Sequence, residues 1–351
     1  MSILNIKKIN LIIILCFNSV LAALISPQNN STLNYIHVLF EWEQKPKVEE
    51  YQFQLFHSSN EDDPLIDTLI SDIYFYEKSF IDWSKSYYWR VNFINENNQN
   101  NWTENYYFET KNNKFNPEIV IELRNSNEMD EEYYLAGISN WTGGKAQFNA
   151  SCIINQFGKE IWNDGDLNVF VNSINSSGEM FGGQDVDWVF NAGIEFNMQG
   201  DILWEEPYNF NLDPHELKQL PNGNYMGFKH ELVEGPIPIG NWTEQFQNIG
   251  YVADGIEYEI NWVGQKLIEI NPETEEIIWS WNPFEYFNYD EFDSIGGTWN
   301  YVINSGRSYY DWLHTNAFFF DKNHNEIYLS HRHLSRITKI DYLTGEVIWV
   351  M

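Results

Sequence analysis

Imidazole and guanidinium groups gather in one short stretch of an otherwise acidic chain. The 351 residues carry a formal net charge of -31 at pH 7, from 20 Lys and Arg against 51 Asp and Glu. Three of the five Arg and four of the eight His lie between residues 307 and 336, and the densest part is His331-Arg332-His333. Arg suits a planar fork of anionic oxygens, and His exchanges protons near neutral pH. This stretch is therefore the first candidate for chemistry.

The directions of these three side chains depend on where the strand that carries them ends. On a continuous strand His331 and His333 share one face and Arg332 lies on the other. All three can reach one ligand only if the strand ends or bulges there. Zinc bound by the two histidines is an alternative, but metal sites need three or four ligands, and we predict neither a metal nor another cofactor. For Arg336 we favour an ion pair with a surface acid.

The composition excludes several classes of protein. Aromatic residues make up 17% of the chain. Disordered chains contain few aromatic residues, whereas β-strands are enriched in them. Proteins that bind nucleic acids need a basic surface to displace counterions, and a net charge of -31 provides none. An anionic membrane surface is disfavoured for the same reason. We predict an all-β protein that binds no nucleic acid.

Residues 1–22 have the three parts of a secretory signal. Lys7 and Lys8 precede an apolar stretch over residues 9–22 that ends in small residues. The stretch is shorter than the roughly 20 residues that a membrane span needs, although an uncleaved anchor is an alternative. We therefore expect a secreted or periplasmic protein with no membrane span after cleavage. Its remaining cysteine, Cys152, has no partner for an internal disulfide.

Residues 24–111 are predicted to form short strands between polar turns. Apolar and polar residues alternate over residues 38–42, 51–55 and 87–93, which indicates a β-sandwich. Residues 112–117 are polar, end in a proline and are expected to be a linker. The motifs that resemble a fibronectin type III module are Phe40-Glu41-Trp42, Tyr88-Trp89-Arg90-Val91, Asn101-Trp102 and Phe108-Glu109-Thr110.

Self-similar segments occur after residue 118. Each begins a turn with Asn or Asp and ends the following strand with Trp: Asn155–Trp162, Asn197–Trp204, Asn271–Trp279 and Asp341–Trp349. Gly stands in three of these turns, and Glu275 replaces it in the other. Such a turn is expected to lead into a strand that ends in a buried Trp. One unit cannot bury both faces, so neighbours must stack radially as blades of a β-propeller. Residues 231–262 and 281–310 are the expected inserts.

Two histidines hold equivalent places in the last two blades. His215 and His314 each enter an inner strand that is followed by a turn and a returning strand. They are therefore expected to face one central channel. A propeller must close on itself, and most propellers have more than four blades. We expect residues 118–351 to form about four blades of a C-terminally truncated propeller that has six blades when intact, with a small four-bladed propeller as the alternative.

Two motifs connect the chain to a known family. The stretch Asp311-Trp312-Leu313-His314-Thr315-Asn316, followed by Ser330-His331-Arg332-His333, resembles the bacterial arylsulfate sulfotransferases, which are secreted β-propeller enzymes. Supporting segments are Asp213-Pro214-His215-Glu216-Leu217 and Leu220-Pro221-Asn222-Gly223-Asn224. The resemblance covers roughly residues 118–351. The paired motifs are fairly specific, whereas the repeats alone are not.

The resemblance implies ping-pong transfer of a sulfuryl group from an aryl sulfate donor to a phenolic acceptor, through a sulfohistidine and without a nucleotide donor. It implies that His215, His314 and Arg332 are catalytic and that Asn316 and His333 bind the substrate. These residue types suit the reaction, because Arg and imidazolium stabilise charge that spreads over sulfuryl oxygens and His can protonate a leaving phenolate. A homodimer is allowed, although no interface can be read from the sequence.

The family's sulfurylated histidine lies downstream of these motifs, beyond residue 351. The resemblance therefore assigns no nucleophile here and predicts no turnover by this chain alone, while His230, His331 and His333 are the histidines that could substitute. Two non-enzymatic alternatives stay open. One is a quinoprotein-like structural propeller, which the segment Asp341–Trp349 also resembles. The other is an adhesion or glycan-binding protein, which the N-terminal module and the many aromatic residues would suit.

Overall fold

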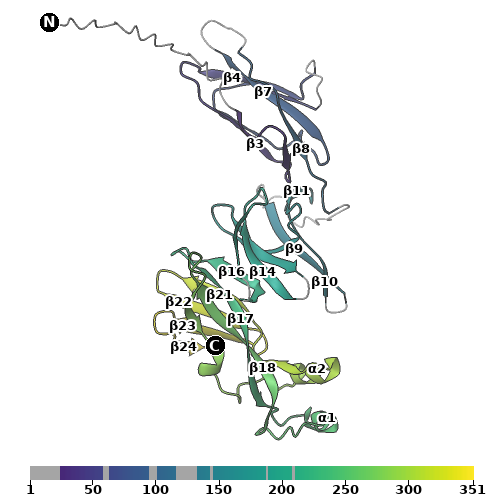
Figure 1. Cartoon of the computed structure of the whole chain (residues 1–351), viewed down its shortest axis with the longest axis vertical. Helices are drawn as coiled ribbons and strands as arrows, with labels where there is room; N and C mark the ends of the chain where they lie inside the picture. The colour runs from purple at the N-terminus through teal and green to yellow at the C-terminus, as the bar shows by residue number, and fades with distance from the viewer. Residues whose placement is uncertain are drawn as a thin grey trace, which may run out of the picture. The chain divides into compact units, whose positions relative to one another are not determined.

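The chain divides into two compact units between Lys111 and Asn112. The computed structural model (Figure 1) describes residues 24–57, 63–94, 101–115, 133–142, 145–186, 189–207 and 210–351, and within these ranges the side chains of 139–148, 185–192, 214 and 215 are not described. The secretory signal predicted over residues 1–22 lies outside the described residues. Strands dominate the structure, so the prediction of an all-β protein is confirmed.

The first unit contains two sheets around an aromatic core. One sheet has the order β1 (Leu24–Ser26), β3 (Val38–Trp42) and β6 (Tyr74–Glu77), and the other has the order β2 (Ser31–Leu33), β8 (Tyr106–Thr110), β7 (Ser86–Ile94), β4 (Glu50–Phe56) and β5 (Ile66–Ile70). Phe40 of β3 packs against Phe53, Trp89 and Phe108 of the second sheet, with ring centroids 4.9 to 5.9 Å apart. The three strands predicted from alternation, β3, β4 and β7, are confirmed.

The second unit is a series of antiparallel sheets in chain order (Figure 1). The sheets are β9 (Tyr133–Thr142), β10 (Lys145–Asn155) and β11 (Glu160–Asn163); β12 (Val169–Ile174), β13 (Met180–Val186), β14 (Val189–Phe196) and β15 (Ile202–Glu205); β16 (Leu212–Gln219), β17 (Tyr225–Pro236), β18 (Tyr258–Ile270) and β19 (Ile277–Trp281); and β21 (Thr315–Asp321), β22 (Glu326–His331), β23 (Arg336–Asp341) and β24 (Val347–Val350). The first strands lie against one another, because β12 contacts β9 and β16, and β16 contacts β21. None of these sheets is closed.

The turns of the four repeats form as predicted. The side-chain oxygen of the leading Asn or Asp accepts backbone N–H groups of its own turn in every repeat. Gly158, Gly200 and Gly345 have φ values of 80°, 88° and 75°, in the left-handed region that favours glycine. Glu275, which replaces glycine, adopts a φ of 58° in the same region. The repeat therefore keeps its backbone conformation even where the glycine is missing.

The prediction that each repeat ends in a buried Trp is wrong for three of the four. Trp162 is buried, Trp204 and Trp279 are half-buried, and Trp349 is exposed. These residues belong to the last strand of each sheet, so the burial of their side chains depends on contacts with the neighbouring sheet. Trp204 stacks on Tyr225 of the third sheet, with ring centroids 3.9 Å apart.

The expected inserts contain the helices of the second unit. They are α1 (Thr243–Asn248), the 3-10 helix η1 (Pro283–Glu285) and α2 (Gly297–Ser305). The first insert is shorter than predicted, because β17 extends to Pro236 and its partner β18 begins at Tyr258, which leaves residues 237–257 between the two strands. A short strand, β20 (Tyr309–Asp311), then pairs with β18 in parallel. Neither α-helix among the described residues has the length and apolar character that crossing a membrane requires.

The inserts surround an aromatic cluster that supports β20. Trp262, Trp299, Tyr310 and Trp312 are all buried, and the rings of Trp299 and Tyr310 stack with centroids 3.7 Å apart. Offset or stacked aromatic pairs of this kind add to the stability that burial gives. The cluster therefore holds both neighbours of Asp311 in fixed positions.

Residues 112–115 of the expected linker are bonded to the first sheet of the second unit. The Lys114 ammonium lies 2.7 Å from a carboxylate oxygen of the buried Asp164. The backbone N–H groups of Lys114 and Phe115 donate to the Glu160 carboxylate at 3.0 and 2.9 Å. Residues 116 and 117 of that linker lie outside the described residues.

Candidate functional site

The candidate site is built on the connection between β20 and β21. Asp311 ends β20, and Trp312 and Leu313 are buried behind it. The backbone N–H of Trp312 donates to the Val263 carbonyl of β18 at 3.0 Å. His314 has a φ of 48°, in the left-handed region that side chains other than glycine seldom adopt. This conformation turns the chain from the third sheet into the fourth and leaves the His314 side chain half-buried.

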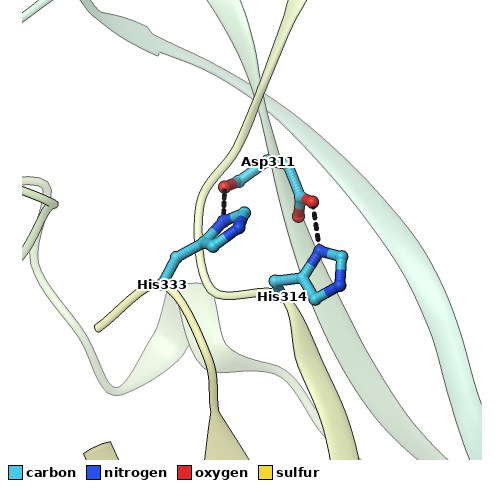
Figure 2. A group of neighbouring side chains, drawn as sticks. All are labelled: Asp311, His314 and His333. Atoms are coloured by element: carbon cyan, nitrogen blue, oxygen red, sulfur yellow. Dashed lines mark hydrogen bonds and ion pairs between the residues drawn. The ribbon is translucent and has the colours of Figure 1, made fainter. Parts of the chain in front are cut away.

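Asp311 and His314 form a close pair. The His314 Nδ1 atom lies 2.5 Å from Asp311 Oδ2, as the dashed line in Figure 2 shows. An ionised carboxylate only accepts hydrogen bonds, so Nδ1 carries the hydrogen and Nε2 is left for other partners. Arg332 Nη1 lies 3.4 Å from Nε2. A guanidinium cation therefore faces the Nε2 atom of an imidazole whose Nδ1 atom is bonded to a carboxylate.

His333 joins the same group from the opposite side. Its Nδ1 donates to the backbone carbonyl of Asp311 at 2.6 Å (Figure 2). The rings of His314 and His333 have centroids 4.7 Å apart. Burial lowers the pKa of the His333 imidazole, and the charges of His314 and Arg332 add to this effect, although the hydrogen bond to the carbonyl opposes it. The neutral form of His333 is therefore favoured, with Nε2 unprotonated.

The Asp311 carboxyl keeps its negative charge in spite of partial burial. Burial acts to raise its pKa, but the hydrogen bond from His314 and the electrostatic interactions with the His314 and His333 rings outweigh that effect, so the pKa lies below the ordinary value. Gln265 of β18 contributes to the same balance with an Nε2 to Oδ1 distance of 3.3 Å. Its side chain lies in the interior, because Gln265 is 3% exposed.

The end of β22 decides which residues of the His331-Arg332-His333 stretch join this group. β22 ends at His331, and the following residues form a turn in which the Ser335 N–H donates to the Arg332 carbonyl. Arg332 and His333 therefore both reach His314. The expectation for a continuous strand, that His331 and His333 share a face, does not apply because the strand has ended.

His331 is a core residue. Its Nδ1 lies 2.7 Å from the Thr315 hydroxyl and its Nε2 lies 2.9 Å from the Thr338 hydroxyl. Burial, aided by the charge of Arg336, lowers the pKa of His331 to about 3. Both nitrogens have partners and the residue is 1% exposed, so His331 is not placed to bind zinc with His333 or to act as a nucleophile.

Two groups of side chains in the described residues could hold a metal ion. One ligand atom from each of Asp311, His314 and His333 lies within 4.8 Å of the others, and Asp321, His324 and Glu326 form a similar group. Histidine binds a metal through an unprotonated nitrogen. In the first group both Nδ1 atoms donate to Asp311, so a metal that used them would replace two hydrogen bonds.

The remaining predicted residues lie on neighbouring strands. His215 belongs to β16, the first strand of the third sheet, and its side chain is outside the described part of the chain. Asn316 lies in β21 at the shift in register between Thr315 and Ala317, and its side chain is half-buried. The Arg336 Nη1 atom lies 2.6 Å from a Glu291 carboxylate oxygen, which is the ion pair that we favoured.

His230 of β17 lies in the third sheet beside a residue of the site. Its Nε2 lies 2.9 Å from Asp213 Oδ2, and the residue stands directly opposite Gln265 in the antiparallel pair of β17 and β18. Side chains of opposed residues share one face of a sheet. His230 and Gln265 are therefore neighbours.

Asp311 and Gln265 belong to the site but were not among the predicted site residues. Asp311 could have been predicted from the sequence, because it lies three residues before His314 within the motif that resembles the family. Gln265 could not, since it is 46 residues from Asp311 and reaches it only through the pairing of β18 with β20.

Comparison with known proteins agrees with the motifs from which the site is built. No curated protein and no solved structure matches the chain. The model of the family described as "Arylsulfotransferase (ASST)" matches residues 175–351, which is just over half of the 351 residues. This range contains every residue of the site, from Gln265 in β18 to His333 after β22. The chain therefore belongs to the arylsulfotransferase family.

Proposed function

We propose that the protein moves a sulfuryl group from an aryl sulfate to a phenolic acceptor. The observation that carries this proposal is the convergence of Arg332 and His333 on His314, whose other nitrogen is bonded to Asp311. A cation and two imidazoles at one point of a strongly acidic chain suit an anionic substrate with a proton to exchange. Family membership favours this activity over the two non-enzymatic alternatives.

Arg332 and His314 have complementary parts in the proposed step. As the bond between sulfur and the aryl oxygen breaks, negative charge grows on that oxygen and stays spread over the sulfuryl oxygens. The Arg332 guanidinium stabilises the sulfuryl oxygens. Protonated His314 gives its Nε2 proton to the departing phenolate, and the Asp311 carboxylate stabilises the imidazolium before the transfer. In the second half of the reaction neutral His314 takes the proton of the acceptor phenol.

We further propose that the sulfuryl group passes through a sulfohistidine. The resemblance puts this histidine beyond residue 351, and among the described histidines His333 and His230 could act in its place, whereas His331 is excluded by its burial. His333 is suited by its unprotonated Nε2. His215 and Asn316 are proposed to hold the sulfate. The contact of β16 with β21 supports this, because it brings the two strands that carry them together.

The finer assignments of fold and setting are also proposals. Successive sheets whose first strands contact one another support a β-propeller. The two sheets around Phe40 support a fibronectin type III-like first unit. The signal-like residues 1–22 support secretion or a periplasmic location. A homodimer is proposed on the resemblance alone.

An acceptor-dependence assay tests the proposed activity. The full-length protein is incubated with a fluorogenic aryl sulfate, with and without added phenol, and release of the fluorescent phenol is followed. The resemblance alone predicts no turnover by this chain, but with His333 as the nucleophile we expect release that depends on the acceptor and that Arg332→Ala abolishes. Hydrolysis of the donor without transfer to the phenol, or no release from any of several donors by protein that is folded in circular dichroism, would contradict the proposal.

A further inference from the structure

The connection from Asp311 to Thr315 must be held in place, because His314 has a left-handed backbone conformation. On one side the turn after β22 holds it. The Arg332 N–H donates to the His314 carbonyl at 3.3 Å, and the His333 N–H donates to the Leu313 carbonyl at 3.1 Å. The backbone at each end is held separately, since Asp311 pairs with Val263 of β18 and Thr315 pairs with His331 of β22, but these pairings do not fix the Asp311 carboxylate.

Gln265 of β18 bonds to both ends. Its Oε1 accepts the Thr315 N–H at 2.8 Å, and its Nε2 donates to Asp311 Oδ1 at 3.3 Å. A backbone N–H can only donate and a carboxylate can only accept. The amide therefore has one orientation that satisfies both partners, and no other uncharged side chain of this length offers an acceptor and a donor in this arrangement.

The strand under Gln265 is well supported. β18 pairs along its length with β17 on one side, and Val263 of β18 is in register with Asp311 of β20. Gln265 itself is 3% exposed. The amide is thus fixed by the sheet and is not free to follow the movements of the connection that it bridges.

We propose that Gln265 is a positioning residue for the transfer reaction. It holds the Asp311 carboxylate and the Thr315 N–H at a fixed separation, and so fixes the orientation of the His314 ring that Asp311 binds. Gln265 does not itself bond to His314, so it acts through Asp311. This inference rests on the proposed transferase function where reaction rates are measured. A second test, which measures the pKa of the Asp311 carboxyl, does not depend on that function.

Two substitutions with opposite chemistry test the role. Gln265→Met keeps the length and removes both hydrogen bonds, and we expect kcat to fall about 100-fold because a small displacement of a reacting group has that effect. Gln265→Glu keeps the acceptor for Thr315 but places a second carboxylate against Asp311. Like charges this close raise the pKa of one carboxyl, and the proton goes to the introduced carboxyl because Asp311 is held ionised.

The pH dependence separates positioning from a structural role. At low pH, the protonated carboxyl of the Gln265→Glu variant can donate to Asp311 while its other oxygen accepts from Thr315, so the bridge is restored. We expect the activity of Gln265→Glu relative to wild type to rise as pH falls, and the same ratio for Gln265→Met to stay flat. The other titratable or charged groups around the bridge among the described residues are His230 with its partner Asp213, His314, Arg332 and His333, and they are common to all three proteins.

A glutamine of the second sheet provides the control. Gln184 Nε2 donates to the Leu167 carbonyl at 2.8 Å, so Gln184→Met removes a hydrogen bond of the same kind away from the site, and its activity should equal that of wild type. A flat ratio for Gln265→Glu, or equal losses in Gln265→Met and Gln184→Met, would overturn the proposal. If Gln265→Met fails to fold, the ratio for Gln265→Glu still decides.

A measurement without substrate keeps the two proposals apart. The pKa of the Asp311 carboxyl is followed by carbon NMR in wild type and in Gln265→Met. Loss of the Nε2 donor is expected to raise this pKa, because the hydrogen bond favours the charged form. If the wild-type protein transfers no sulfuryl group but the Asp311 pKa is raised in Gln265→Met, the proposed transferase function is contradicted and the bridging role of Gln265 is supported. An unchanged Asp311 pKa overturns the bridge whatever the activity.

Discussion

The sequence contains the spacing Asp-x-x-His twice, and the two copies lie in different surroundings. Asp311 and His314 connect the third sheet to the fourth, with 2.5 Å between Oδ2 and Nδ1, whereas Asp321 and His324 lie on the turn after β21 with 2.8 Å between the same atoms. The His314 side chain is 27% exposed and that of His324 is 68% exposed. The local motif therefore forms the same hydrogen bond in both places.

What differs is the set of groups around each pair. Around Asp311 the Gln265 amide donates to the carboxylate and Arg332 approaches the far side of the imidazole. Around Asp321 the hydrogen bond and charge of that carboxylate raise the pKa of His324, and the charge of Glu326 adds to this effect. The two copies therefore share the Asp–His hydrogen bond and differ in the guanidinium that approaches His314.

The largest expected difference between the two copies is in the histidines. His314→Ala removes the group that we propose exchanges the proton with the phenol, and we expect a loss in kcat of about 100- to 10,000-fold, the range that general acid and base catalysis contributes. His324→Ala removes the equivalent imidazole on the exposed turn and should leave the rate unchanged. Both are measured with the fluorogenic aryl sulfate and a phenol acceptor.

This pair of variants can contradict the comparison directly. Equal losses in His314→Ala and His324→Ala, with unchanged thermal unfolding, would show that the surroundings do not distinguish the two pairs. A loss only in His324→Ala would move the site to the exposed turn.

A smaller difference is expected between the aspartates. Asp311→Asn keeps the shape of the side chain but removes the charge that we propose assists proton transfer by His314, and we expect a loss of about 10- to 100-fold, the range found for the hydrogen-bond partners of metal-bound histidines. The loss should be larger for donors whose phenols are weak acids, since these leaving groups need protonation most. Asp321→Asn should have no effect with any donor, and a loss that is equal across donors in Asp311→Asn would contradict the role of Asp311 in proton transfer.

The same contrast shows how far the sequence could predict the site. The repeated turns were predictable, since Asn271 initiates its turn and Glu275 adopts the left-handed φ even without glycine. The paired motifs around His314 and Arg332 were predictable too, because both are contiguous in sequence. Strand pairing across 46 residues brought Gln265 to Asp311, and no local pattern carries that information.

Errors arose where the outcome depends on neighbouring elements. Trp204 and Trp349 occupy the same position in the repeat, but Trp204 stacks on Tyr225 of the next sheet and Trp349 is exposed. His331 and His333 are two residues apart, yet one is in the core and the other in the site, because β22 ends between them. Periodicity describes a strand well and says little about the residue at which it stops.

Histidines that differ in surroundings should also differ in how they affect stability with pH. His331 has its pKa lowered to about 3 by burial, against about 6.5 in an unfolded chain. Its contribution to the free energy of unfolding is fully present above the unfolded pKa and is lost as pH falls toward the folded pKa, because the unfolded chain binds a proton that the folded protein does not. The expected slope is about 1.4 kcal/mol per pH unit between these limits.

Substitution of His331 isolates this contribution. His331→Gln can still bond to Thr315 or Thr338 and does not titrate, so the difference in unfolding free energy between wild type and variant should change with pH below about 6.5, as measured by urea unfolding at several pH values. His324 should behave in the opposite sense, since its pKa is raised and its stabilising interaction is lost as pH rises through the folded value. A difference between wild type and His331→Gln that does not vary with pH would mean that His331 has the same pKa in the folded and the unfolded protein, and would contradict the burial of its imidazole as the cause of the shift.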